Sequence, residues 1–188
     1  FFVIQTKRLL LRQWQPSDFP LFAELCADSE VMKYFPSTLS RAESDDFVAR
    51  IQGLIEERGW GLWAVEVLGL SDFIGFVGLH VPKDHLPCSP CVEIGWRLAK
   101  PYWGKGYASE AATAALDYAF TELQLDEVLS FTAVANLPSQ AVMKRIGMTN
   151  TGNNFMHPDI EASHPLCEHV LFRINRADWK QAKTLPST

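Results

Sequence analysis

The chain has 188 residues, of which 47% are apolar and 21% are charged, a composition that suits one compact domain with a conventional core. It carries 17 Lys and Arg against 22 Asp and Glu, and the formal net charge of −5 offers no basic surface for nucleic acid or acidic lipid. No apolar run reaches the roughly 18 residues of a membrane-spanning helix, and no signal-peptide pattern opens the chain. We therefore expect a soluble, cytoplasmic protein, monomeric or homodimeric, that binds neither nucleic acid nor membrane.

The first third of the chain predicts one strand and two helices. Residues 6–12 (TKRLLLR) predict the strand, and residues 16–26 predict a helix because proline and aspartate suit its first turn. A longer helix is expected over 40–58, where the first residue is serine and Glu43 completes a capping box with it. Gly59 is expected to end this helix.

A hairpin and a further strand follow. Residues 60–67 and 73–81 predict two antiparallel strands around the turn-forming segment 69–72. Residues 91–98 predict the next strand, in which successive side chains point to opposite faces. The apolar face is formed by Val92, Ile94, Trp96 and Leu98, and the other face carries Glu93, Gly95 and Arg97. That second face therefore bears a single carboxylate.

The second half of the chain alternates helices and strands. Polar residues recur every three or four positions over 104–124, which predicts a helix lying on a sheet. The remaining expected elements are a strand over 128–134, a short helix over 137–146 that Gly147 ends, and strands near 149–156 and 168–174. No repeat, linker or low-complexity tract divides the sequence. We therefore expect residues 1–188 to form a single mixed α/β domain.

The four cysteines are too few and too irregularly spaced for a disulfide framework, so free thiols are expected. Cys88 and Cys91 have the spacing of a zinc knuckle, and His80 and His85 lie just upstream. The chain has no second CxxC pair, however, and the prolines within this segment indicate a loop. We therefore expect no metal site.

The segment Trp103–Ser109 joins a strand to a long helix and contains two glycines with a lysine between them. The first N–H groups of a helix have no internal partners, the helix dipole adds positive charge there, and glycine lets a phosphate approach the main chain. Lys105 adds a point charge. The segment is therefore a candidate anion site, and the alternative is an ordinary glycine-rich turn.

Spacing narrows the phosphate ligands that could fit. A P-loop needs GxxxxGK followed by Ser or Thr, which is absent. A dinucleotide fingerprint needs glycine or alanine where Ser109 stands, although Glu127 does lie about 20 residues past the glycines. Pro101 interrupts the tight strand-to-helix turn, and the glycines follow an antiparallel meander rather than a first parallel strand. A Rossmann-type oxidoreductase is therefore the weaker alternative.

The same segment resembles the diphosphate-binding loop of the GNAT superfamily of acyl-CoA N-acyltransferases, written Q/R-x-x-G-x-G/A. Three further segments resemble the RimJ/RimL branch of that superfamily, in the same order along the chain: they are 6–12 (first strand), 93–98 (fourth strand) and 136–148 (second CoA-side motif). One departure is Trp103, which stands where the general motif has Gln or Arg. This departure matters little if main-chain N–H groups bind the ligand.

The resemblance implies an α/β (α+β) fold with a mixed, mostly antiparallel central sheet of about six or seven strands, helices on both faces and a splay between the fourth and fifth strands. It implies acetyl-CoA as the acyl donor and a primary amine, on a protein N-terminus or a small molecule, as the acceptor. The residues implied for coenzyme A are Trp96, Arg97 and Leu98 for the pantetheine arm, Trp103, Gly104, Lys105, Gly106, Tyr107, Ala108 and Ser109 for the diphosphate, and Asn136 and Ser139 near the thioester. Asn136 is also a good N-cap, which is its structural alternative.

Direct attack of the amine on the thioester, without an acyl-enzyme, is also implied by the resemblance. A free amine has a pKa of about 8 at a chain terminus and about 10 on lysine, so a base is useful at neutral pH. Glu93 is our candidate base, directly or through a water chain, and its alternative is an ion pair with Arg97 on the same strand face. The candidates for stabilising the oxyanion and protonating the thiolate are a main-chain N–H near Trp96 and the Ser139 hydroxyl.

Several other features have simpler interpretations. His157, His164 and His169 lie between the last strands, where contact with backbone or water is favoured over a metal cluster or a substrate lid. Most tryptophans are expected to pack in the core or at its rim. The alternative to an active enzyme is a module that binds acyl-CoA without turnover, and the sequence does not identify the acceptor amine.

Overall fold

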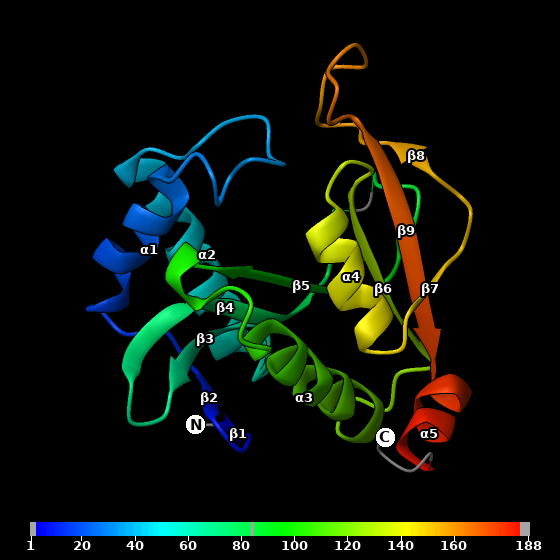
Figure 1. Cartoon of the computed structure of the whole chain (residues 1–188), viewed down its shortest axis with the longest axis horizontal. Coiled ribbons are helices and arrows are strands. Elements are labelled where there is room, and N and C mark those ends of the chain that lie inside the picture. Colours follow the sequence, from blue (N-terminus) through cyan, green and yellow to red (C-terminus); the bar gives the residue numbers. More distant parts are fainter. Residues whose placement is uncertain (1–2, 84, 185–188) are drawn as a thin grey trace. The chain divides into compact units, whose positions relative to one another are not determined.

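The computed structural model describes residues 3–83 and 85–184, and Figure 1 shows how the helices and strands follow one another along the chain. Contacts within the chain define two compact units. Of the described residues, the first unit contains 3–80 and 95–115, and the second contains 81–83, 85–94 and 116–184. Each unit contains both strands and helices, as predicted for a mixed α/β chain.

The first unit contains an antiparallel sheet. Its strands are β1 (Ile4–Gln5), β2 (Leu9–Arg12), β3 (Leu62–Val67) and β4 (Ser71–His80), which pair in that order, and the end of β5 (Glu93–Leu98) lies beside β4. The β3–β4 hairpin confirms the prediction for 60–81. At Gly75 an added Cβ would lie 2.1 Å from the carbonyl oxygen of Arg97, so the closeness of β4 and β5 requires glycine at this position.

The predicted strand over 6–12 is wrong in its first part. Thr6 Oγ1 accepts a hydrogen bond from Leu9 N at 3.0 Å, and Thr6 N donates to Leu9 O at 2.9 Å, so a tight turn separates β1 from β2. Only residues 9–12 form the strand, in which Leu9 and Leu11 are fully buried. A threonine hydroxyl that bonds nearby backbone competes with strand pairing, and a leucine-rich pattern does not reveal this competition.

Two helices of the first unit, α1 (Asp18–Ala27) and α2 (Arg41–Arg58), confirm the predicted ones. At the start of α2, Ser40 Oγ accepts from Glu43 N at 3.2 Å and Ser40 N donates to Glu43 Oε1 at 3.0 Å, which completes the capping box. Gly59 ends α2 with a φ of 86°, in the left-handed region that favours glycine.

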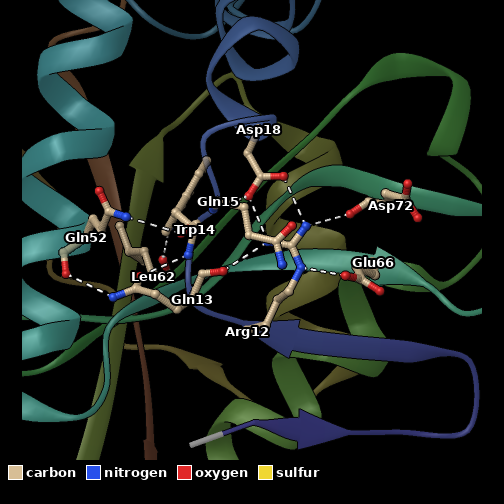
Figure 2. A network of polar contacts seen from close by, with 9 residues as sticks. All are labelled: Arg12, Gln13, Trp14, Gln15, Asp18, Gln52, Leu62, Glu66 and Asp72. Atoms are coloured by element: carbon tan, nitrogen blue, oxygen red, sulfur yellow. Dashed lines mark hydrogen bonds and ion pairs between the residues drawn. The ribbon is translucent and has the colours of Figure 1, made fainter. Parts of the chain in front are cut away.

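A buried arginine ties α1 to the sheet of the first unit (Figure 2). Arg12 in β2 is 5% exposed, and its guanidinium forms a bidentate ion pair with Asp18 at 2.7 and 3.0 Å. Its other N–H groups donate to Glu66 Oε1 at 2.6 Å and to the carbonyl oxygens of Gln13 at 2.9 Å and Asp72 at 2.7 Å. Each N–H donor of this guanidinium therefore has an acceptor.

The second unit is built around the antiparallel pair β6 (Glu127–Ala133) and β9 (Glu168–Asn175). The short strands β7 (Thr149–Asn150) and β8 (Phe155–Met156) also pair with β9. One strand was expected near 149–156, and the structure has these two instead. The beginning of β5 pairs with β6 in parallel, with Glu93 opposite Leu129.

The described residues form nine strands, where six or seven were expected. Three of the nine, β1, β7 and β8, have only two residues each, and the six longer strands match the expected number. Six strand pairs of the described residues are antiparallel and β5–β6 is parallel, so the pairing is mostly antiparallel as predicted. A doubly wound Rossmann sheet is mostly parallel, and this pairing pattern does not fit it.

Three helices remain, and two of them were expected. Helix α3 (Tyr107–Thr121) begins in the first unit and ends in the second, and α4 (Leu137–Arg145) lies in the second. Gly147 follows α4 with a φ of 97°, as predicted for the residue that ends this helix. Helix α5 (Arg176–Thr184) was not predicted; none of its residues is fully buried, and Trp179 packs on Phe120.

Trp14, Trp63 and Trp179 pack as expected. Trp14 and Trp63 are buried in the first unit, and Trp14 Nε1 donates to Leu62 O at 2.9 Å. In the second unit, Trp179 packs on Phe120 with 5.2 Å between ring centroids. Over the described ranges, none of the helices combines the length and apolar character needed to cross a membrane.

Candidate active site

The glycine-rich segment before α3 has the backbone geometry of an anion site. Gly104 and Gly106 have φ angles of 72° and 80°, in the left-handed region where glycine is favoured. Gly106 O accepts from Glu110 N at 3.0 Å, which places Gly106 at the start of the helix. The N–H groups of Tyr107 and Ala108 lie in the first helical turn and so have no i−4 carbonyl partner within the helix.

Arg8 holds this segment from the side. Its Nη1 donates to Lys105 O at 2.9 Å, and its guanidinium carbon lies 4.6 Å from the centre of the Tyr107 ring. A Cβ added at Gly106 would lie 3.3 Å from Arg8 Nη2, tighter than most real Cβ contacts. The arginine thus supports the loop and limits the size of the residue at position 106.

Glu110 fixes Arg8 in turn. Arg8 Nε donates to Glu110 Oε1 at 2.7 Å, Arg8 N donates to Oε2 at 3.0 Å, and Thr6 Oγ1 donates to Oε2 at 2.5 Å. Burial acts to raise the pKa of Glu110, but the hydrogen bonds from Thr6 and Arg8 outweigh it and lower that pKa. None of these three residues was predicted as part of the site, because the pairing joins segments far apart in the chain.

Trp103, the departure from the family motif, has a structural role. Its Nε1 donates to Leu98 O at 2.9 Å, although the side chain is 45% exposed. Ala99 N donates to Ile74 O at 2.8 Å, so the main-chain N–H and C=O groups of residues 97 and 99 point toward β4. The N–H and C=O of Trp96 therefore point toward the other edge of β5. Of the main-chain groups predicted to bind pantetheine, those of Trp96 and the Leu98 N–H are therefore directed away from β4.

Glu93, the predicted base, opens β5 in the second unit. Burial raises the pKa of its carboxyl group to about 8. Among the residues that the structure describes, its carboxylate has no ion-pair partner, and Arg97 pairs with no carboxylate either. The predicted alternative, an ion pair of Glu93 with Arg97, is therefore not formed.

Arg97 lies in a cluster of aromatic rings in the first unit. Its guanidinium carbon is close to four phenylalanine rings, with centroid distances of 4.4 Å to Phe35, 5.4 Å to Phe76, 5.6 Å to Phe47 and 6.0 Å to Phe22. Its Nη1 donates to Cys26 Sγ at 3.4 Å, and Nε is buried without a hydrogen bond. Burial lowers the pKa of Arg97, and the Cys26 thiol partly offsets this effect. The sequence predicted a main-chain role for Arg97 and, as the alternative for Glu93, an ion pair, but not this aromatic cluster.

Asn136 and Ser139 begin α4 in the second unit. Asn136 Oδ1 accepts from Ser139 N at 3.2 Å, which confirms Asn136 as the N-cap, and its Nδ2 donates to Thr132 Oγ1 at 2.9 Å. Ser139 is half-buried. Asn136 therefore has the predicted structural role of N-cap, and both the oxygen and the nitrogen of its side-chain amide form hydrogen bonds.

The histidines of the last loop make local contacts. His157 Nδ1 accepts from Asp159 N at 3.1 Å, and His164 Nδ1 accepts from Leu166 N at 3.0 Å. The rings of His157 and His169 lie 5.0 Å apart, and burial lowers the pKa of both. These contacts agree with the favoured interpretation, in which the histidines bond to backbone.

The CxxC segment lies in the second unit. Cys88 and Cys91 are free thiols with 3.2 Å between their sulfur atoms. No group of three or more His, Cys, Asp or Glu side chains suited to a metal ion is found within 3–83 and 85–184. A shallow hollow of about 460 Å³ lies beside Cys91 and Glu127 and contains none of the predicted site residues.

Comparison with known proteins gives consistent relatives. The family model described as "Acetyltransferase (GNAT) domain" matches residues 8–149. The chain is 32% identical over 179 residues to "Uncharacterized N-acetyltransferase YnaD" of Bacillus subtilis (strain 168), covering 94% of this chain and 98% of that protein. It is 34% identical over 125 residues to "FsC-acetyl coenzyme A-N(2)-transacetylase" of Aspergillus fumigatus, covering 64% of this chain and 52% of that protein.

Solved structures show the same fold. An acetyltransferase (GNAT family) from Bacillus anthracis aligns with a TM-score of 0.75 at 28% identity, covering 93% of this chain and 98% of that one. RimL, a ribosomal L7/L12 alpha-N-protein acetyltransferase solved in complex with coenzyme A, shares the fold with a TM-score of 0.72 at 17% identity, covering 93% of this chain and 98% of that one. Together with the family match over the glycine loop and β5, these relatives show that the chain belongs to the GNAT family of acetyltransferases.

Proposed function

We propose that this chain is an acetyl-CoA-dependent N-acetyltransferase that moves an acetyl group to a primary amine by direct attack. The observation that carries the proposal is the segment Trp103–Ser109, in which two left-handed glycines lead into the start of α3 and Arg8 holds the loop. Proteins of the same fold solved in complex with coenzyme A support this ligand. The family match takes residues from both units, which supports one acetyltransferase domain over the whole chain.

The donor is proposed to bind mainly through main-chain groups. The diphosphate would accept hydrogen bonds from the N–H groups of the segment Gly104–Ser109, with the dipole of α3 and the charge of Lys105 adding attraction. The pantetheine amides would pair with the Trp96 C=O and the Leu98 N–H, because Leu98 O already accepts from Trp103, and this leaves the Trp96 N–H free for the oxyanion. Asn136 would orient the first turn of α4 toward the thioester.

The chemical step needs a neutral amine, because only the free lone pair attacks the thioester carbon. Glu93 is proposed to take the ammonium proton, directly or through water, since its pKa of about 8 is close to that of a free amine. The C–N bond forms as a tetrahedral oxyanion develops, and the Trp96 N–H would donate to that oxygen. The C–S bond then breaks and the nitrogen releases its second proton. Ser139 would relay that proton, giving its hydroxyl proton to the thiolate as it accepts the one from the nitrogen, so that the products are a neutral amide and the coenzyme A thiol.

The experiment that tests turnover is thiol release from acetyl-CoA with a panel of small amines and peptides with free N-termini. We expect release that depends on the amine, together with an acetylated product detected by mass spectrometry. Binding of coenzyme A without release for any amine would instead identify a module that binds the donor without turnover. Absence of coenzyme A binding would contradict both.

A further inference from the structure

Two arginines of the first unit, Arg12 and Arg97, have very different hydrogen-bond partners. Arg12 has an acceptor for every N–H donor, including two carboxylates (Figure 2). Arg97 has one hydrogen bond among the described residues, to the Cys26 thiol at 3.4 Å, and its Nε is buried without a partner. Buried polar groups nearly always have partners, so an unpartnered charged donor calls for an explanation.

The charge of Arg97 is also unbalanced. Burial raises the pKa of Cys26, so its thiol stays neutral at pH 7 and supplies no negative charge. No carboxylate pairs with Arg97 within the described ranges 3–83 and 85–184. The four phenylalanine rings attract the cation through their faces but accept no conventional hydrogen bond.

A second polar atom in this cluster is also unsatisfied. The Ser44 hydroxyl, in α2, lies near the same Cys26 thiol and lowers the pKa of that thiol. Its Oγ is nevertheless buried without a hydrogen bond of normal geometry. The cluster is not sealed from water, because Arg97 is partly exposed and Phe35, the ring nearest its guanidinium, is 40% exposed. A small molecule can therefore approach this side of the cluster beside Phe35, and it would reach Nε by displacing the side chains that shield this atom from solvent.

We propose that Arg97 binds a carboxylate of the acceptor amine, an inference that rests on the proposed function of the chain. The Nε and Nη2 donors of a guanidinium form a fork that matches the two oxygens of a carboxylate. Because Nη1 is directed at Cys26, this fork is the edge left without a protein partner. A phosphate is less well matched, since the other arginine beside these rings, Arg50 over Phe47, is exposed.

The position of Arg97 on β5 suits an acceptor site. Its main chain is adjacent to Trp96, which we assign to the pantetheine arm and the oxyanion, and its side chain leaves the strand on the opposite face from the Trp96 side chain. The surrounding phenylalanine rings favour an apolar or aromatic body. The acceptor class is therefore an amine that carries a carboxylate and an apolar side chain, as apolar amino acids do.

Direct binding of phenylacetate to the full chain tests this inference without turnover. We expect saturable binding by calorimetry or NMR, no saturable binding of phenylacetamide, and a loss of at least about tenfold in Arg97→Met, equal to about 1.4 kcal/mol. Arg50→Met is the matched control, because Arg50 is an exposed arginine that also lies over the Phe47 ring, and we expect it to keep wild-type binding. Equal binding of phenylacetate to wild type and Arg97→Met, or no binding to wild type, would overturn the inference.

A second variant covers loss of folding. If Arg97→Met unfolds, Arg97→Lys keeps a cation among the rings but loses the guanidinium fork. We expect it to keep coenzyme A binding and to lose phenylacetate affinity by at least about tenfold. Wild-type phenylacetate affinity in a folded Arg97→Lys protein would overturn the proposed bidentate contact.

Kinetics with matched amines links the site to the reaction. L-phenylalanine and phenethylamine differ only by the carboxylate, and we expect kcat/KM to favour L-phenylalanine by at least about tenfold in the wild type. In Arg97→Met the preference should disappear through a rise in KM for L-phenylalanine alone. Equal acetylation of both amines by a wild type that binds coenzyme A would overturn this inference and leave the proposed function standing, whereas absence of coenzyme A binding would overturn the proposed function.

Discussion

Arg8 and Glu110 lie 102 positions apart in the sequence, and their side chains form an ion pair with 2.7 Å between Nε and Oε1. The pair joins the turn before β2 to the first turn of α3. Because the same guanidinium donates to Lys105 O, the turn between β1 and β2 fixes the loop that we assign to the diphosphate. The anion site therefore depends on more than its own sequence.

Removing Arg8 should weaken donor binding. In Arg8→Met the loop loses its hydrogen bond at Lys105 and its support beside Gly106, so we expect coenzyme A affinity to fall by about tenfold, the equivalent of one charged hydrogen bond. Calorimetric titration with coenzyme A measures this change. Arg41→Met is the control, because Arg41 makes an exposed i,i+4 pair with Asp45 in α2. Equal affinities in the two variants would show that Arg8 does not position the loop.

The lowered pKa of Glu110 predicts a pH-dependent contribution to stability. A carboxylate whose folded pKa is depressed stabilises above its unfolded pKa of about 4.3, and this contribution is lost as the pH falls through the folded value. The free energy of unfolding of the wild type should therefore exceed that of Glu110→Gln most at pH 7 and converge with it in acid. A difference that stays constant from pH 7 to pH 3 would contradict the assigned ion pair.

The Arg12–Asp18 pair should dominate the stability of the first unit. In Asp18→Asn the buried guanidinium loses its bidentate partner, and removing one member of a buried pair costs about 3–5 kcal/mol in the free energy of unfolding. Chemical denaturation measures the loss. Asp45→Asn is the matched control, since its exposed pair with Arg41 should contribute only about 0.3–0.5 kcal/mol.

The raised pKa of Glu93 predicts how activity depends on pH. A base must be deprotonated to accept a proton, so kcat/KM should rise as the pH increases through about 8, and Glu93→Gln should lose most activity above that pH. The measurement is the pH–rate profile with one amine whose own ionisation is corrected for. A wild-type profile in Glu93→Gln would assign the proton to another group or to water alone.

The raised pKa of Glu93 should also change how the free energy of unfolding depends on pH, which can be measured without turnover. Because its folded pKa lies above its unfolded value of about 4.3, its contribution is fully present below that value and is lost as the pH rises through about 8. Glu93→Gln should therefore gain stability relative to the wild type at pH 9. Equal pH dependence of thermal unfolding in both proteins would show that the carboxyl is not raised in the folded state.

Local signals in the sequence predicted the elements that depend on local bonds. The capping box of Ser40 and Glu43 and the left-handed Gly59 place both ends of α2. The spacing of Gly104 and Gly106 predicts an anion site, and both glycines have left-handed φ angles. The strand over 6–12 was predicted too long because the Thr6 hydroxyl forms a turn with Leu9. This error comes from a single side-chain hydrogen bond that competes with the regular strand pattern.

Contacts between distant segments could not be predicted in the same way. The support of the glycine loop by Arg8 and the aromatic cluster around Arg97 bring together residues from strands, helices and loops of the first unit. Alternation in 91–98 predicted which face Arg97 occupies but not what covers that face. Periodicity reports burial, and the identity of the partner comes only from the tertiary structure.

Binding of coenzyme A to Gly106→Ala tests the central claim most directly. Gly106 and Gly152 both have left-handed φ angles, of 80° and 77°, but an added Cβ meets Arg8 only at Gly106 and finds open space at Gly152. Calorimetry should show tight binding to the wild type and to Gly152→Ala, and binding weaker by at least about tenfold to Gly106→Ala. Equal heats for all three proteins, or none with the wild type, would contradict the assignment of this loop to the donor.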